Sequence, residues 1–401
     1  MYLRYLLLAA VAALLPLYAQ QPLRPLLVIS VDGLDNRYLR DADAMGLKIP
    51  NLRKFAARAQ YAQNGVMGVF GTVTWPSHTS MITGARPIEH GILNNKRPAS
   101  EGGDYYWTPN LLKSRTLWQR VTDAGGTTAA ITWPVTSEAK IDYNLPEYFQ
   151  RRNGGAMDLD SITLKATPAS LVASIRKQYP SFGTEWMDDR NRTLATMYIV
   201  GQLKPTLTLL HLVDLDSEQH ERGPFTPEAK AMLEYTDELI GRILAATPSN
   251  VTVAIVSDHG FELTEKILNP YVLVSQAGLK NALTVASGVV VAKSPEIASF
   301  LEGKPGIGRK IPLDELKRFA PELADGAVAA FEPADHVMFG RGVDVLWPEH
   351  KPRGEHGLWP GRPNYRSIFL AAGPSIVPQK LGELSMVDIN ARFEKLLGLT
   401  K

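Results

Sequence analysis

Three hydrophobic runs in the sequence each end in an aspartate. They are residues 26–31 before Asp32, residues 206–213 before Asp214 and residues 251–257 before Asp258. Near-continuous apolar runs of this length are typical of parallel strands that are buried on both faces. Open α/β sheets bind their ligands at the carboxyl ends of such strands. The sequence therefore predicts that three strand ends bring carboxylates and nearby imidazoles to one edge of a sheet, where a metal site can form.

The rest of the chain alternates between strand-like and helix-like stretches from about residue 26 to residue 256. This alternation predicts an α/β fold, a doubly wound and mostly parallel sheet flanked by helices. After residue 260 short apolar runs are broken by glycine and proline, which predicts a smaller α+β cap insertion. We expect a catalytic core in residues 24–260 and 354–401, with the cap in residues 261–353. Helices are expected at residues 50–59, 227–246 and 387–397, and further strands at residues 128–133 and 366–371. The short runs of the insertion include residues 287–292 and 336–339.

Composition narrows the possible ligands. A length of 401 residues suits one large domain with an insertion, or two domains. The formal net charge of +2 gives no electrostatic reason to expect a nucleic-acid polymer as partner. The chain has no cysteine, which excludes disulfides, catalytic thiols and thiolate zinc sites. Any metal must therefore be held by oxygen and imidazole alone.

The first residues have the pattern of a secretory signal. Arg4 precedes an apolar stretch at residues 5–18, and the small residue Ala19 follows. An anchoring helix is the alternative, but the run is shorter than the roughly 18–20 apolar residues that a membrane span needs. We therefore expect a signal peptide at residues 1–19, no stable membrane span after its removal, and export. An exported protein without disulfides suits a bacterial periplasm or secretion.

Two carboxylate and imidazole pairs follow the predicted strands. Asp258 and His259 are adjacent at a strand end, where a loop allows both side chains to reach one cation. Asp216 and His220 are four residues apart and would share one face of a helical turn. Asp214 is the competing carboxylate, and the spacing to His220 favours Asp216. A turn aspartate with a surface histidine, and a solvated loop, are the alternatives for these segments.

Thr74 and His356 are the remaining candidates. Pro76 predicts a helix start that places Thr74 just ahead of the helix N-terminus, where anions are favoured. A hydroxyl becomes a strong nucleophile when coordination to a divalent metal causes it to lose its proton. The alternative role for Thr74 is that of a strand or capping threonine. His356 lies between Gly354 and Gly357, where the backbone can bend sharply towards a ligand, or it is a histidine in an exposed turn. The other histidines are expected to be structural or on the surface: His78, His90, His211, His336 and His350.

Together these segments resemble the alkaline phosphatase superfamily and, within it, the nucleotide pyrophosphatase/phosphodiesterase family, the type I phosphodiesterases. The resemblance spans about residues 26–397 and rests on the joint order and spacing of motifs that are each weak alone. These are residues 31–33, 74–78, 83–84, 91–95 and 257–260, Asp216 with His220, and residues 354–357.

The resemblance implies two divalent metal ions, expected to be zinc, and a small phosphodiester or nucleotide as substrate. It implies that Thr74 attacks phosphorus to form a covalent phospho-threonine, and that Asn95 donates a hydrogen bond to a phosphate oxygen. The implied ligands of one zinc are Asp32, Asp258, His259 and the Thr74 hydroxyl, and those of the other are Asp216, His220 and His356. The sequence departs from the family pattern at Trp75, at Ser77 and after His356, at residues 358–360, which leaves nucleotide specificity open.

Other functions fit the sequence less well. A phosphomonoesterase usually needs an arginine beside its nucleophile, whereas Val73 and Trp75 flank Thr74. A sulfatase would have an arginine at the position of His78. A carbon–phosphorus hydrolase such as phosphonoacetate hydrolase, which uses nearly the same metals and threonine, is the alternative enzyme. A binding or carrier protein with a structural metal site is the alternative from another class.

Overall fold

The computed structural model describes residues 22–149, 151–152, 156–157, 159–183 and 187–399. The signal peptide predicted for residues 1–19 lies outside the described residues and stays a prediction. Among the helices of the described residues, none is both long enough and apolar enough to cross a membrane.

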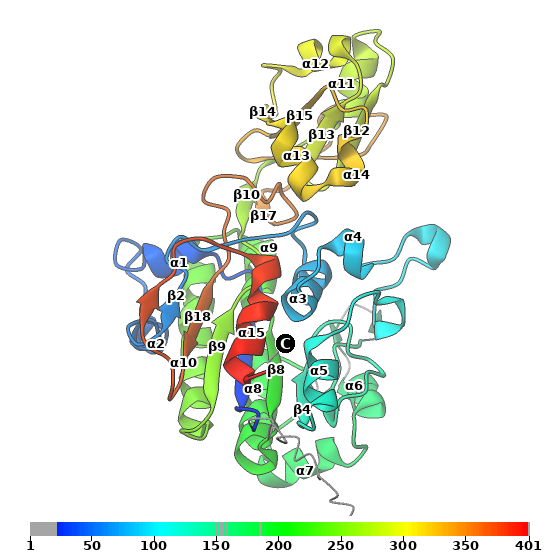
Figure 1. The fold of residues 1–401 in the computed structure, drawn as a ribbon. Coiled ribbons are helices and arrows are strands. Elements are labelled where there is room, and N and C mark those ends of the chain that lie inside the picture. The colour runs from blue at the N-terminus through cyan, green and yellow to red at the C-terminus, as the bar shows by residue number, and fades with distance from the viewer. Residues whose placement is uncertain (1–21, 150, 153–155, 158, 184–186, 400–401) are drawn as a thin grey trace, which may run out of the picture.

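A mixed eight-stranded sheet forms the centre of the molecule (Figure 1). Five neighbouring strands, in the order β5-β4-β8-β1-β9, are parallel, and β18 runs antiparallel to both β9 and β2 at the other side. The predicted α/β fold with a mostly parallel sheet is confirmed. The strands of this sheet are β1 (Leu26–Val31), β2 (Gln60–Tyr61), β4 (Thr128–Ile131), β5 (Tyr143–Leu145), β8 (Leu207–Leu212), β9 (Thr252–Val256), β18 (Phe369–Ala372) and β19 (Gln379–Lys380).

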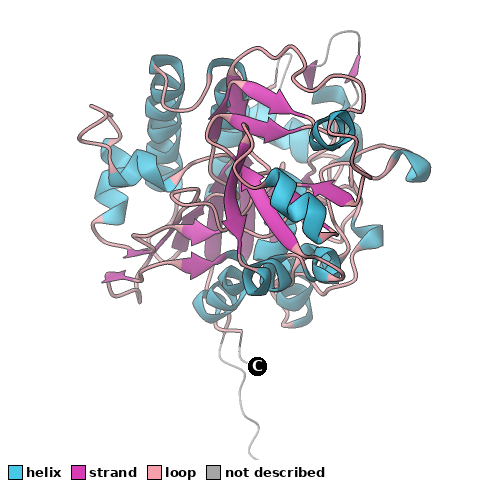
Figure 2. Cartoon of the chain, turned by 90° about the horizontal axis from the view of Figure 1, so that it is seen from above, coloured by secondary structure: helices cyan, strands magenta, loops and turns pink. Residues whose placement is uncertain are grey.

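Helices lie on both sides of the strands (Figure 2). The helices around the central sheet are α1 (Asn36–Arg40), α2 (Pro50–Ala56), α3 (Thr74–Thr83), α4 (Pro87–His90), α5 (Leu117–Asp123), α6 (Leu159–Lys165), α7 (Leu171–Gln178), α8 (Asp189–Tyr198), α9 (Asp214–Arg222), α10 (Pro227–Ala246) and α15 (Ile389–Leu397). Short helical turns are η1 (Ala99–Glu101), η2 (Pro109–Leu111), η3 (Ile199–Leu203) and η4 (Met386–Asp388). Two further strand pairs are β3 (Val66–Met67) with β20 (Leu384–Ser385), and β6 (Arg151–Arg152) with β7 (Ala156–Met157).

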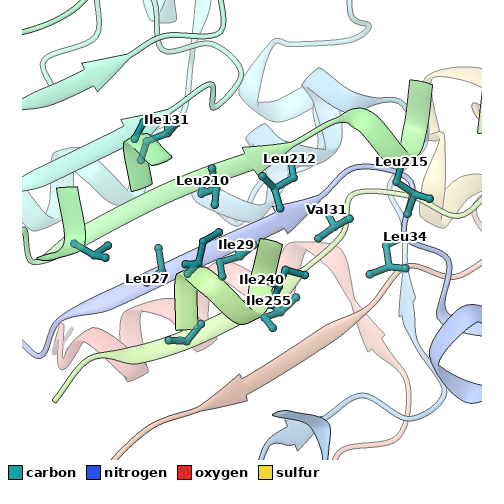
Figure 3. Close-up of a cluster of buried hydrophobic side chains, with 14 of the residues drawn as sticks. Leu27, Ile29, Val31, Leu34, Ile131, Leu210, Leu212, Leu215, Ile240 and Ile255 are labelled. Carbon is teal, nitrogen blue, oxygen red and sulfur yellow. The ribbon is translucent and has the colours of Figure 1, made fainter. Parts of the chain in front are cut away.

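Strand β1 shows why its sequence is almost entirely apolar. Leu27, Ile29 and Val31 belong to one buried cluster, which includes residues of α10 and appears in Figure 3. Leu26 and Val28 point to the opposite face and belong to a second buried cluster, which includes residues of α15. Because successive side chains of a strand alternate between faces, a sheet covered on both sides selects apolar residues at nearly every position. Ser30 is the polar exception in β1.

Some predicted bounds need correction. Helix α10 matches its predicted range, but α2 ends at Ala56 and not at residue 59, because the following residues turn into β2. The strand predicted at residues 128–133 ends at Ile131, because Thr132 has a φ of 48°, in the left-handed region that a strand does not use.

Residues 261–353, which we call the cap, contain a separate antiparallel sheet (Figure 1). Its strands are β12 (Leu283–Ala286), β13 (Val289–Ala292), β15 (Ala329–Pro333) and β14 (Ile307–Ile311), in this spatial order. Its helices are α11 (Pro270–Gln276), α12 (Pro295–Leu301), α13 (Leu313–Phe319) and α14 (Pro321–Ala324). The pair β10 (Glu262–Thr264) with β17 (Arg353–Glu355) lies where the chain enters and leaves the cap, and β11 (Lys266–Leu268) pairs with β16 (Val337–Phe339) inside it. The cap has its own buried cluster, with residues such as Leu268, Val290 and Leu301.

Candidate metal centre and active site

The three strands whose runs end in aspartate are neighbours in the order β9-β1-β8. Ser30 of β1 pairs with Val256 of β9 on one side and with His211 of β8 on the other. The carboxyl ends of these parallel strands therefore meet at one edge of the sheet. Asp32 follows β1, Asp258 follows β9, and α9 begins just after β8.

Asp32, Asp258 and His259 form the first group of possible metal ligands, with ligand atoms all within 4.8 Å of one another. His259 Nε2 lies 3.2 Å from Asp32 Oδ1 and 3.2 Å from Asp258 Oδ2. The other oxygen of Asp258 accepts backbone N–H bonds from Gly33 and His259, each 3.1 Å long. These two bonds fix the carboxylate so that Oδ2 faces Asp32 and His259.

Helix α9 and the segment after β17 supply the second group. His220 Nε2 lies 3.6 Å from Asp216 Oδ1, as the four-residue spacing on one helix predicts, and His356 Nε2 lies 3.7 Å from the same oxygen. The Nδ1 atom of each ring contacts a backbone carbonyl, at Gly354 for His220 (2.9 Å) and at Thr72 for His356 (3.2 Å). A contact at Nδ1 orients an imidazole and leaves Nε2 for a metal.

The imidazole of His259 lies close to both groups of possible ligands. The ligand atoms of Asp216, His259 and His356 also lie within 4.8 Å of one another, and the rings of His259 and His356 stack with centroids 3.8 Å apart. We call the whole set the strand-end cluster, which consists of Asp32, Asp216, His220, Asp258, His259 and His356.

The strand-end cluster fits divalent cations. Within the described part of the chain, four of its buried side-chain atoms have no hydrogen-bond partner. Leaving such atoms buried without a partner is costly, and native proteins usually satisfy them. Carboxylate oxygens and imidazole nitrogens that converge in this way are the mixed ligands that zinc accepts. The four atoms are Asp32 Oδ1, Asp216 Oδ1, Asp258 Oδ2 and His259 Nε2.

Burial also shifts the protonation of these groups. Loss of solvation raises the pKa of Asp32 and of Asp258 well above the usual range of a carboxyl, and the nearby carboxylates add to the effect. Loss of solvation lowers the pKa of His259 and of His356 well below the usual value, so the rings are neutral, the form that binds a metal. A divalent cation would stabilise the ionised carboxylates that burial disfavours.

Thr74 is buried and is the first residue of α3, with Val73 at the N-cap. The prediction that Thr74 lies just ahead of the helix is therefore wrong by one position. Pro76 becomes the third helical residue, which the helix accepts because the first N–H groups of a helix need no partner within it. Thr74 remains in the first turn, where the helix dipole favours an anion.

Two side chains connect the start of α3 to its surroundings. Asn95 Oδ1 accepts the backbone N–H of Trp75 at 2.9 Å, which leaves the Asn95 amide nitrogen as a donor. His78 Nδ1 lies 2.8 Å from the Thr74 carbonyl and 3.6 Å from Asp258 Oδ2. The first turn of α3 is thus linked through His78 to the strand-end cluster, and His78 is a structural hydrogen-bonding residue.

One residue that the sequence left without a role belongs beside the cluster. His211 is buried, and its Nε2 lies 2.9 Å from Asp32 Oδ2 while its Nδ1 lies 3.0 Å from the Thr132 carbonyl. The sequence did not predict a role for His211, because it is a polar residue within a mostly apolar strand. The signal that identifies it is its position opposite Ser30 in the register of β8 and β1.

The alternative carboxylate, Asp214, makes other contacts. It accepts the backbone N–H of Asp189 at 3.0 Å and lies 3.6 Å from a guanidinium nitrogen of Arg192. Of the remaining histidines, His90 is buried against Ser80, and His336 is exposed.

Comparisons with known proteins point to one protein family. A family model described as type I phosphodiesterase / nucleotide pyrophosphatase matches residues 26–334. The chain is 23% identical over 250 residues to ectonucleotide pyrophosphatase/phosphodiesterase family member 1 of Mus musculus, which covers 59% of this chain and 24% of the relative. It is also 23% identical over 250 residues to venom phosphodiesterase 2 of Crotalus adamanteus, covering 59% of this chain and 27% of that protein. The chain thus spans only about a quarter of the length of these curated relatives.

The fold also matches a solved structure. Murine ectonucleotide pyrophosphatase/phosphodiesterase 5, an inactive variant in complex with AMP, superposes with a TM-score of 0.65 and 19% sequence identity. The match covers 94% of this chain and 96% of that one. The fold thus places the protein in the alkaline phosphatase-like α/β class. The family match is more specific: the chain belongs to the type I phosphodiesterase / nucleotide pyrophosphatase family.

Proposed function

We propose that the protein is a metal-dependent hydrolase that cleaves phosphodiester or phosphoanhydride bonds in small molecules such as nucleotides. The observation that carries this proposal is the set of buried carboxylate and imidazole atoms without hydrogen-bond partners in the strand-end cluster, linked through His78 to the first turn of α3. Family membership supports the same reaction class.

In this proposal the cluster holds two divalent ions, with zinc as the expected metal. Bound cations would lower the pKa of the Thr74 hydroxyl and stabilise the charge on the attacking and leaving oxygens. The ligands of one ion are Asp32, Asp258, His259 and Thr74, and those of the other are Asp216, His220 and His356. His259 lies close to both groups.

Thr74 acts as the nucleophile. Its hydroxyl loses a proton and its oxygen forms a bond to phosphorus, while the bond from phosphorus to the leaving oxygen breaks on the opposite side. Water then cleaves the phospho-threonine and restores the hydroxyl. Asn95 donates its amide N–H to a phosphate oxygen, in an orientation that its bond to the Trp75 N–H supports.

The surroundings of Thr74 favour diesters over monoesters. Val73 and Trp75 flank it, so the adjacent side chains provide no positive charge for the second negative charge of a monoester. Aromatic rings pack beside this position, since Trp75 lies 4.9 Å from the ring of Tyr105 and 6.1 Å from that of Trp107. Rings of this kind can stack on a nucleobase, and the solved murine relative is a complex with AMP.

We also propose that residues 24–260 and 354–401 form the catalytic core and residues 261–353 its cap. The pairing of β10 with β17 supports these limits, because the two strands lie at the start and the end of the insertion. Separate buried clusters in the two parts support them as well.

A substrate panel tests the proposed function. The substrates are p-nitrophenyl thymidine 5′-monophosphate, bis-p-nitrophenyl phosphate, p-nitrophenyl phosphate and phosphonoacetate, each with zinc-loaded protein. We expect the two diesters to have the highest kcat/KM. Faster turnover of p-nitrophenyl phosphate would identify a phosphomonoesterase, and faster turnover of phosphonoacetate a carbon–phosphorus hydrolase. Zinc binding without turnover of any substrate would favour a binding protein.

A further inference from the structure

A cavity of about 500 Å³ lies between the cap and the segment that follows α3. The core contributes residues between Phe70 and Tyr106, and the cap contributes the β12–β13 turn, the end of α13, α14 and Arg341. This volume is in the range of ligand-binding pockets.

The cavity lies beside the first turn of α3, as contacts in its walls indicate. Asn94 in its wall precedes Asn95, whose side chain accepts the Trp75 N–H. Gly71, also in the wall, accepts the backbone N–H of Val73 at 2.7 Å. The wall thus includes Asn94, the chain neighbour of the proposed phosphate donor, and Gly71, which lies three residues before the proposed nucleophile.

The cap side of the cavity packs against the segment that follows His356. Ser287 lines the cavity, and the next residue, Gly288, packs so tightly that an added Cβ would lie 2.5 Å from Leu358 Cα. Leu358 is two residues from His356. Phe70 in the core wall contacts Trp359, with ring centroids 5.7 Å apart. The cavity therefore has walls anchored next to the site on both sides.

The charges in the cavity are strongly unbalanced. Four cationic side chains and one carboxylate, that of Glu322, line it. Of the cations, Arg86 pairs with Glu89 at 2.7 Å, whereas Lys96, Arg97 and Arg341 make no ion pair with any described residue. The Nε of Arg97 is buried and has no hydrogen-bond partner among the described residues. A buried guanidinium N–H without a partner calls for an acceptor.

The same cavity has an apolar surface. Phe70, Leu93, Ile88 and Phe319 line it, and Leu93 and Ile88 are 52% and 44% exposed. An inorganic anion alone would leave these side chains in contact with water. A ligand that uses the whole cavity has an apolar body and an anionic end.

We propose that this cavity binds one ester arm of a phosphodiester substrate, an arm that consists of an apolar chain with a terminal carboxylate or phosphate. The apolar chain lies against Leu93 and Ile88, and the terminal anion is held by Arg97 and Arg341. This inference rests on the proposed phosphodiesterase function, and it names the class of substrate that the enzyme selects.

The test compares two chromogenic diesters, hexyl p-nitrophenyl phosphate and 5-carboxypentyl p-nitrophenyl phosphate. They have chains of similar length and the same leaving group, and they differ in the terminal charge. We expect the carboxylated diester to have a kcat/KM about 10-fold higher, mainly through a lower KM, because charge-assisted hydrogen bonds to arginine add binding energy. Equal values for the two diesters in the wild-type protein would overturn the cavity proposal and leave the phosphodiesterase proposal intact. Hydrolysis of neither diester would contradict both.

Variants of the two arginines test whether the preference for the carboxylated diester arises in the cavity. In R97Q/R341Q the ratio of the two kcat/KM values is expected to fall to about one. The control K54Q/K380Q removes two positive charges from exposed positions outside the cavity and should keep the wild-type ratio. If R97Q/R341Q has a lower Tm than the wild type, R341Q alone, which changes an exposed side chain, should still lower the ratio about threefold. A wild-type ratio in R341Q and in a folded R97Q/R341Q would overturn the proposal.

Discussion

The strand-end cluster and the cap cavity are neighbouring regions of one molecule, but they are built in different ways. The cluster consists of short side chains that follow strands or lie on α9. Four of them are buried, His220 and His356 are partly buried, and backbone groups contact Asp258 and His220. The cavity is lined by long cationic side chains, among them Lys96 and Arg341, which are exposed and come from separate loops.

This difference separates two tasks. A position at a strand end is set by the backbone of the sheet, so the cluster can hold atoms within a fraction of an ångström, as metal chemistry demands. Long side chains on loops can adjust to ligands of different shape, and they change without disturbing a core. We infer that the core determines the reaction and that the cap, with the loop after α3, determines the substrate. The predictions below test this division, beginning with the largest expected effect.

Thr74→Ala should have the largest effect. Removal of the nucleophilic oxygen is expected to lower kcat for bis-p-nitrophenyl phosphate about 10³-fold or more. Zinc content, measured by atomic emission, should stay at about two ions per chain, because carboxylates and imidazoles supply most of the ligands. Thr83→Ala, in the last turn of the same helix, is the control and should keep its activity. Retained activity in Thr74→Ala would exclude the covalent route.

His356→Ala should remove one metal. The variant loses a ligand of the second group, so we expect the zinc content to fall by about one ion per chain and kcat to fall about 100-fold or more. The comparison variant is His336→Ala, which changes an exposed histidine of the cap. An unchanged metal count would show that another group, such as His350, is the ligand.

His211→Gln tests a positioning role. The His211 ring orients Asp32 through a 2.9 Å contact, and loss of such a support typically costs 10- to 100-fold in metal affinity or activity, about the drop we expect. A zinc titration should show a weaker Kd together with the lower kcat, which a general loss of stability would not produce at a temperature well below Tm. His336→Gln is the matched control. Wild-type zinc affinity and kcat would show that Asp32 needs no support from His211.

Leu301→Ala should have the smallest effect on catalysis. Leu301 is fully buried in the cap, so the variant is expected to lose about 2–5 kcal/mol of stability, measured by urea denaturation. Turnover of bis-p-nitrophenyl phosphate at 25 °C should change by less than about threefold, since the cap does not supply the reacting groups. Leu210→Ala removes the same atoms from β8 of the central sheet and should lower turnover more, because β8 leads into α9. An equal loss of activity in both variants would contradict the division of tasks.

Much of the central sheet could be predicted from the sequence, because burial on both faces leaves a simple signal. The run at residues 26–31 is β1, and the run at residues 206–213 contains β8 (Leu207–Leu212). The cap was harder to predict. Strand β14 (Ile307–Ile311) was not predicted, because its middle residues are polar and solvent-facing. It also contains Gly308, which lies close to the backbone of Pro333. Short antiparallel strands with one covered face do not produce a long apolar run.

Some residues of the candidate site could likewise be predicted from the sequence, and others could not. Residues next to a strand end, such as Asp32 and Asp258, could be proposed from local sequence, because the strand places them. His211 could not, since its contact with Asp32 depends on the register between two strands that are distant in sequence. The cavity had no sequence signal at all, because its cations, such as Arg97 and Arg341, come together only through the packing of the cap on the core.

The paired strands β10 and β17 have one more consequence. They hold the departure and the return of the chain side by side, so the two ends of the insertion stay together whatever the length of the chain between them. Insertions at such points are well tolerated. We therefore expect that the cap can be replaced by another insertion, with a change of substrate, while the core keeps its reaction.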